Sequence, residues 1–115
     1  MHSDHQRMNW IPVCKLTEIM PNTGVCALIN GEQIAVFHVV DDEHRVFAIH
    51  NFDPNSDAAV LSRGLVGNLG ERIVVASPIY KQHFDLQTGE CLEAPENSIN
   101  AYPARIANEQ VWVGI

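Results

Sequence analysis

The side chains best suited to chemistry in this 115-residue chain are two histidines and an aspartate around one irregular stretch. His50 and His83 flank residues 50–70, which are polar and contain glycines, and Asp53 lies within them. Imidazole and carboxylate groups bind metals and transfer protons, so these three residues could form a catalytic or metal site. Neither His-x-His nor His-x-x-Glu spacing occurs to supply a further ligand. A free-standing enzyme or metal-binding protein that uses His50, His83 and Asp53 is therefore kept as an alternative function.

The cysteines show no pattern of a metal or redox site. The chain has three of them, Cys14, Cys26 and Cys91, and no Cys-x-x-Cys pair. Zinc fingers and thioredoxin-like proteins depend on such pairs. We expect reduced and mostly buried thiols, with a structural role for Cys91.

The charge balance disfavours several classes of partner. Seven basic and fourteen acidic residues give a net charge of −7, whereas nucleic acids and anionic membranes are bound by basic surfaces. The 46% share of hydrophobic residues is typical of a folded protein. The first residues lack the apolar stretch of a signal peptide, and no apolar run approaches the roughly 18 residues of a membrane span. We therefore expect a cytoplasmic protein, with a flexible arm at residues 1–8 and a single domain at residues 9–115.

Short strands separated by turns are predicted along most of the chain. Asn30-Gly31 between two apolar runs predicts a hairpin, since both residues tolerate a positive φ. The following run, residues 33–40, is apolar at nearly every position and therefore predicts a central strand. No stretch shows helical periodicity over ten residues. The pattern predicts an all-β protein, an antiparallel sandwich or barrel.

Glycines mark two further features. Thr88-Gly89 after an apolar segment predicts a turn in which Gly89 has a positive φ. Gly64, Gly67 and Gly70 recur at every third residue, with no strand expected before them and no helix after them. We interpret this repeat as a mobile loop and not as a phosphate-binding loop.

The stretch from Val74 to Cys91 resembles the second cluster-binding loop of Rieske proteins. In that family a strand leads into Cys-Pro-x-His, followed by an aromatic-Asp-Leu strand and a Thr-Gly-Glu turn. Here the first motif reads Ser77-Pro78-Ile79-Tyr80, and Phe-Asp-Leu and Thr-Gly-Glu follow in order. Upstream, residues 51–55 fall where the family has its first Cys-Pro-His. The resemblance implies a Rieske-like antiparallel β-sandwich or barrel with a small, loop-rich tip at about residues 50–86.

The four positions of the cluster ligands hold none of the residues that a Rieske cluster needs. A Rieske [2Fe–2S] cluster is bound by two thiolates and two imidazoles. By the resemblance, the corresponding positions here are Asp53, Asn55, Ser77 and Tyr80. A carboxylate, an amide, a hydroxyl and a phenol do not replace that set. An intact electron-transfer ferredoxin is therefore disfavoured, and no cofactor is expected on this chain.

A Rieske-like scaffold without its ligands resembles one family, the small subunit of the cytoplasmic assimilatory NAD(P)H-dependent nitrite reductase. The Ser-Pro-Ile-Tyr-Lys-Gln-x-Phe stretch at residues 77–84 is its most specific mark, and Leu61-Ser62-Arg63-Gly64 is another. The resemblance implies a non-catalytic subunit that is required for reduction of nitrite to ammonium in nitrate assimilation. The large subunit of that family carries FAD, an iron–sulfur cluster and siroheme, and would be the partner.

The former cluster edge is the expected contact with that partner. Rieske proteins present the cluster to electron partners at positions that correspond to Tyr80, Lys81, Gln82 and His83. Lys81 is one of only two lysines in the chain. The alternative is that an exposed edge strand carries this lysine merely to discourage aggregation. We also expect the rings of Tyr80 and Phe52, with Ile79 and Pro54, to fill the space that a cluster would occupy.

Overall fold

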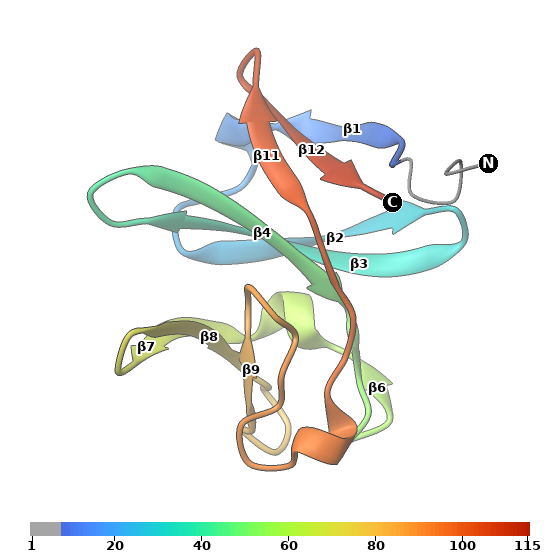
Figure 1. The fold of residues 1–115 in the computed structure, drawn as a ribbon, viewed down its shortest axis with the longest axis vertical. Helices are drawn as coiled ribbons and strands as arrows, with labels where there is room; N and C mark the ends of the chain where they lie inside the picture. Colours follow the sequence, from blue (N-terminus) through green and yellow to red (C-terminus); the bar gives the residue numbers. More distant parts are fainter. Residues whose placement is uncertain (1–7) are drawn as a thin grey trace, which may run out of the picture.

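Antiparallel strands in three stacked layers make up the computed structural model, which describes residues 8–115 (Figure 1). The all-β class predicted from the sequence is confirmed. The predicted arm lies outside the described residues except for Met8. The only helical segments in the described part are three short 3₁₀ turns: η2 (Leu16–Glu18), η3 (Leu61–Arg63) and η4 (Pro95–Asn97). None of the helices between residues 8 and 115 has the length and apolar character needed to cross a membrane.

Two sheets form the base of the molecule. The first has the order β1 (Trp10–Lys15), β12 (Gln110–Gly114), β11 (Ala104–Ala107). The second has the order β10 (Ala101–Tyr102), β4 (His44–His50), β3 (Glu32–Val40), β2 (Thr23–Ile29). The predicted hairpin joins β2 to β3, with φ of 51° at Asn30 and 81° at Gly31.

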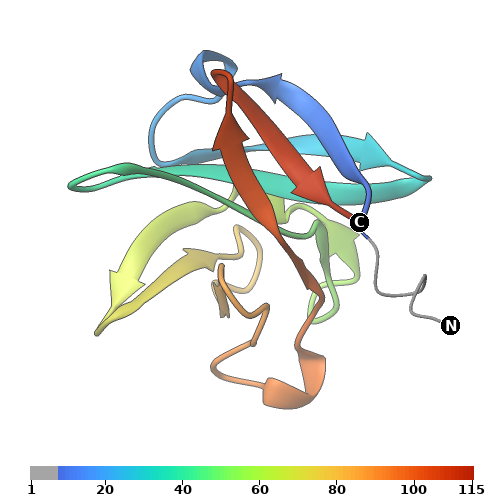
Figure 2. The same cartoon turned by 45° about the horizontal axis from the view of Figure 1, so that its top comes forward.

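The third layer, which we call the tip, packs against the second sheet on the face opposite the first (Figure 2). A pair of two-residue strands, β5 (Phe52–Asp53) and β6 (Ala58–Ala59), begins it. A three-stranded sheet follows, with the order β7 (Leu65–Leu69), β8 (Arg72–Ala76), β9 (His83–Asp85). Two loops are thereby placed side by side, one after β5 and one between β8 and β9.

Strand β3 is buried on both of its faces, as its unbroken apolar run predicts. Successive side chains of a strand point to opposite faces. Ala35, Phe37 and Val39 pack toward the tip, while Ile34 and Val36 pack toward the first sheet. The strand therefore belongs to both hydrophobic cores and links the tip to the base.

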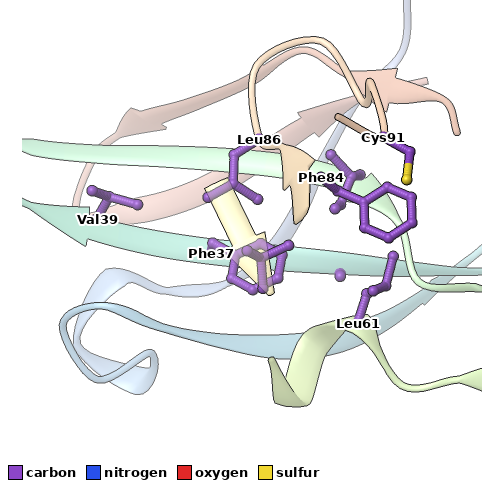
Figure 3. Packing of buried hydrophobic residues seen from close by; sticks show 9 residues of the cluster. Phe37, Val39, Leu61, Phe84, Leu86 and Cys91 are labelled. Atoms are coloured by element: carbon purple, nitrogen blue, oxygen red, sulfur yellow. The ribbon is translucent and has the colours of Figure 1, made fainter. Parts of the chain in front are cut away.

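The core between the second sheet and the tip fixes where the two loops lie (Figure 3). Phe37 from β3 shares this core with Leu61 from η3, Phe84 from β9 and the buried Leu86 and Cys91. Burial of a large apolar side chain stabilises a fold by about 1.5–3 kcal/mol. The tip is therefore anchored to the base by packing, independently of any contact between the loops.

Two expectations from the sequence are wrong. The stretch with the Gly64, Gly67, Gly70 repeat is not a loop, because β7 occupies residues 65–69 and pairs with β8. Gly70, with φ of 63°, turns the hairpin, and the glycine and asparagine inside β7 hid its strand character from the sequence. The cysteines are not mostly buried: Cys91 is buried, Cys14 is half-buried, and Cys26 on the edge strand β2 is exposed.

Gly89 has the predicted positive φ, at 83°, and a Cβ there would overlap the carbonyl oxygen of Ile99. Gly70 has a similar φ but open space around it. Gly70→Ala should therefore lower the unfolding free energy by only about 1–2 kcal/mol, which is the penalty for a residue with a Cβ in the left-handed conformation. Gly89→Ala should cost clearly more, because the backbone of residue 99 must also move. Chemical denaturation of both variants measures the difference, and equal losses would contradict this account of the turn.

Candidate functional site

The structure brings together three of the four positions that correspond to cluster ligands. Asp53 lies on β5, Asn55 in the turn after it, and Ser77 directly after β8. Hydrogen bonds connect these three side chains. Tyr80 is not part of the group, because its side chain is 64% exposed on the outside of the second loop.

The carboxylate of Asp53 is the centre of this group and is fully buried. Its Oδ2 accepts hydrogen bonds from Ser77 Oγ at 2.5 Å and from Ser56 Oγ at 2.9 Å. Its Oδ1 accepts from the Asn55 backbone N–H at 2.9 Å and from Asn55 Nδ2 at 3.3 Å. Burial acts to raise the pKa of Asp53, but the bonds from Ser77, Ser56 and Asn55 outweigh it and hold the pKa below its ordinary value. The carboxylate is therefore ionised at neutral pH.

Asn55 extends the group to a third segment of the chain. Asn97 on η4 donates from Nδ2 to Asn55 Oδ1 at 2.7 Å. Asn55 in turn donates to the sulfur of the buried Cys91 at 3.6 Å. We call the side chains of Asp53, Asn55, Ser56, Ser77 and Asn97 the polar network. It links the first loop, the second loop and η4.

Asn51 fixes the start of the first loop to the base. It is buried, and its Nδ2 donates to Gln33 Oε1 on β3 at 3.2 Å. Its Oδ1 accepts from the backbone N–H of Ser62 at 2.7 Å. The loop that carries Asp53 and Asn55 is therefore held at both of its ends.

The residues of the polar network do not fit a [2Fe–2S] cluster. Such a cluster requires thiolate and imidazole ligands, and the three converging positions offer a carboxylate, an amide and a hydroxyl. The oxygens of Asp53 are already committed to donors from both loops. Hydrogen bonds thus form the connection between the loops that a cluster makes in a Rieske protein.

The expected filling of this space by apolar side chains is wrong. Ile79 is 46% exposed and Tyr80 is 64% exposed, while Phe52 and Pro54 are half-buried at the edge of the loop. Short polar side chains span the distance between the loops, so no ring is needed there. The second loop then turns its larger side chains toward solvent.

The outer face of the second loop, residues 80–83, is only partly free to meet a partner. Tyr80 and Lys81 are exposed, and Lys81 has a positive φ of 60°. His83 is engaged within the chain: its backbone N–H and its Nδ1 contact the Glu93 carboxylate at 2.7 and 2.6 Å. Burial acts to raise the pKa of Glu93, but these bonds from His83 outweigh it and lower the pKa. Gln82 is half-buried, and its Oε1 has no hydrogen-bond partner among the described residues.

The alternative site of His50, His83 and Asp53 is not assembled. Asp53 is enclosed in the polar network, His83 pairs with Glu93, and the ring of His50 lies 6.4 Å from the ring of Phe52. Over residues 8–115, no three His, Cys, Asp or Glu side chains are grouped so that they could hold a metal ion.

Comparison with known proteins identifies the family to which this chain belongs. The sequence model of the Rieske-like [2Fe-2S] domain family matches residues 9–114. The chain belongs to this family. Within it, the chain is 46% identical over 97 residues to the nitrite reductase (NADH) small subunit of Salmonella typhimurium, a match that covers 84% of this chain and 89% of that protein. The family expected from the sequence, the nitrite reductase small subunits with a Rieske-like domain, is confirmed.

Two further relatives define the extent of the likeness. The NMR structure of the Escherichia coli protein NirD superimposes with a TM-score of 0.86 at 40% identity, covering 95% of this chain and 98% of the other. The nitrite reductase [NAD(P)H] large subunit of Klebsiella oxytoca contains a stretch that is 39% identical over 105 residues. That stretch corresponds to 91% of this chain but only 11% of the larger protein.

Part of the polar network was not apparent from the sequence. Ser56 follows Asp53 at the spacing of a side-chain-capped turn, a local signal that could have identified it. Asn97 is 42 residues from Asn55, and no local pattern links the two. Cys91, for which a structural role is expected, is buried in the core, and its contact with Asn55 was not expected.

The stability of the folded chain should depend on pH through Asp53 in the polar network. Because the pKa of Asp53 is lower in the folded chain than in the unfolded chain, its stabilisation is complete above the unfolded value of about 3.9 and is lost as the pH falls through the folded value. Asp53→Asn presents an amide N–H₂ to donors that need an acceptor, so it should be less stable at pH 7. Denaturation curves should show that the unfolding free energy of Asp53→Asn is lower than that of wild type by a constant amount between pH 7 and 5. Below about pH 4 this difference should become smaller. A difference that is independent of pH, or grows with acid, would contradict this assignment.

Proposed function

We propose that this chain is the small, non-catalytic subunit of a cytoplasmic NAD(P)H-dependent nitrite reductase that reduces nitrite to ammonium in nitrate assimilation. Its partner is a large subunit that carries FAD, an iron–sulfur cluster and siroheme. The chain itself carries no cofactor and acts by binding. Similarity to proteins named nitrite reductase small subunits supports a part in nitrite reduction. The structure of the tip supports the role of binding the large subunit.

The observation that carries the proposal is the use of three former ligand positions for hydrogen bonding. Asn55 and Ser77 both donate to the buried Asp53 carboxylate, so these three side chains bind one another inside the tip and do not face a substrate site. At the same time the tip keeps its shape and presents Tyr80 and Lys81 to solvent. A tip that keeps its shape through hydrogen bonds, and not through a bound cluster, is suited to binding another protein.

The position of the chain ends is compatible with docking through the tip. Asn9 and Ile115, which flank β1 and β12 of the first sheet, are joined by two backbone hydrogen bonds of 3.0 and 3.1 Å. In the Klebsiella oxytoca large subunit, the related stretch is part of one long polypeptide. A covalent connection at the base leaves the tip free to contact the rest of the protein.

The docking face that we assign consists of residues 80–83, Tyr80, Lys81, Gln82 and His83. Tyrosine combines a large apolar ring with a hydroxyl and is enriched among residues that dominate binding energy. Gln82 is half-buried, and its Oε1, which is buried and lacks a partner within residues 8–115, would reach the large subunit only after the side chain turns outward. His83, held by Glu93, keeps the loop in place from behind.

Reconstitution with the large subunit tests the proposed function. Nitrite-dependent NADH oxidation by the large subunit should rise when this chain is added, and the chain alone should show none. The purified chain should be colourless and should contain no iron after reconstitution with iron and sulfide. About two irons per chain would identify an electron-transfer ferredoxin, and activity of the chain alone would favour the free-standing enzyme.

Tyr80→Ala tests the docking face. If Tyr80 is buried at the subunit contact, the variant should bind the large subunit more weakly by about 2 kcal/mol. Met20→Ala is the matched control, because Met20 is also an exposed apolar residue but precedes β2 in the base. Calorimetric titration of both variants measures the effect. Equal affinity of Tyr80→Ala and wild type would exclude residues 80–83 as the anchor of the contact.

A further inference from the structure

A pocket of about 230 Å³ lies beside the docking face, between the start of β7 and the second loop. Its lining consists of Arg63, Leu65, Ala76, Ser77, Pro78 and Lys81, and we call it the tip pocket. Small-molecule sites usually enclose about 300–1,000 Å³. The tip pocket is smaller than these and suits a side chain of another protein better than a cofactor.

Exposed apolar residues lie in the two segments that line the tip pocket. Leu65, which lines it, is 80% exposed although it begins a strand. Ile79 and Tyr80 lie in the adjacent loop and are also exposed. Large apolar side chains that gather on one exposed face mark contact sites, whereas single scattered ones need no explanation.

Two cations border the tip pocket, and neither has an ion-pair partner among residues 8–115. Arg45 pairs with Asp41, Arg72 pairs with Glu90, and Arg105 stacks on the ring of Trp10. Arg63, Lys81 and, on β1 in the base, Lys15 form no such contact within the described chain. A protein with a net charge of −7 thus places, at the edge of one apolar pocket, two positive charges that have no ion-pair partner in the part of the chain that the structure describes.

The backbone of Lys81 adds an independent observation. Six described non-glycine residues have a positive φ, and four of them are Asn or Asp, which tolerate this conformation. Lys81 and Glu109 lack that tolerance. Glu109 lies in the turn between β11 and β12, whereas the conformation of Lys81 is held by a hydrogen bond of 3.0 Å from its N–H to the Ser77 carbonyl. Strain of this kind persists where the surrounding structure enforces it and is concentrated at functional sites. Here it places the lysine at the rim of the tip pocket.

We propose that the tip pocket binds an apolar side chain of the large subunit that is flanked by carboxylates, with Leu65 as the apolar contact and Arg63 and Lys81 as partners of the acidic groups. This inference rests on the proposed function and extends the docking face from residues 80–83 to β7. The occupant is an acidic segment of the large subunit, because both charges at the pocket that lack an ion-pair partner within residues 8–115 are positive.

Two variants and two matched controls test the tip pocket in the complex with the purified large subunit. Leu65→Ser removes the apolar contact, and Leu28→Ser is its control because Leu28 is 73% exposed on β2. The double variant Arg63→Glu, Lys81→Glu reverses the charge, and Lys15→Glu on β1 controls for a change of net charge. Circular dichroism and thermal melts confirm that each variant is folded.

The expected result is at least about tenfold weaker binding for Leu65→Ser and for the charge reversal. The charge reversal should lose most of its effect at high salt, because salt screens exposed charges, and the controls should bind like wild type. If wild type binds but the tip-pocket variants match their controls, this inference is wrong and the proposed function stands. If the wild-type chain neither binds nor stimulates the large subunit, both are wrong. Backbone NMR shifts at Arg63 and Lys81 on addition of nitrite, together with unchanged subunit affinity, would instead identify a site for a small anion and overturn the proposal.

Discussion

A buried, ionised carboxylate constrains the tip of this protein. A charge removed from water is costly unless hydrogen bonds replace the lost solvation. Asp53 obtains that replacement from Ser56 and Asn55 in its own loop and from Ser77 in the second loop. The two loops must therefore stay closed for the charge to remain satisfied.

The shape of the outer surface follows from this closure. Short polar side chains meet inside, so the larger side chains of the second loop, Ile79 and Tyr80, are turned outward. The hydrophobic core between β3 and the tip holds the same loops from the other side through Phe37 and Phe84. The surface beside the former cluster position thus presents apolar groups together with Arg63 and Lys81, on a rigid support.

The sequence predicted the elements whose signals are local. The Asn30-Gly31 hairpin, the doubly buried β3 and the left-handed Gly89 each depend on a few neighbouring residues. The resemblance to Rieske proteins located the two loops and showed that their ligands were replaced. What replaced them could not be predicted, because Asp53 and Ser77 are 24 residues apart and Asn55 and Asn97 are 42 apart. β7 was missed for another reason: Gly67 and Asn68 carry weak strand propensity, and pairing with β8 supplies the stability.

The central claim is that hydrogen bonds, and not iron, hold the two loops together, and amide hydrogen exchange of the iron-free chain tests it most directly. The Lys81 N–H donates to the Ser77 carbonyl at 3.0 Å, and the Asp57 N–H donates to the Asp53 carbonyl at 2.8 Å. If the polar network closes the loops, both amides should exchange far more slowly than in an unfolded chain, with no metal added. Exchange of both amides at the rate of an unfolded chain, and protection only after iron and sulfide are supplied, would contradict the claim.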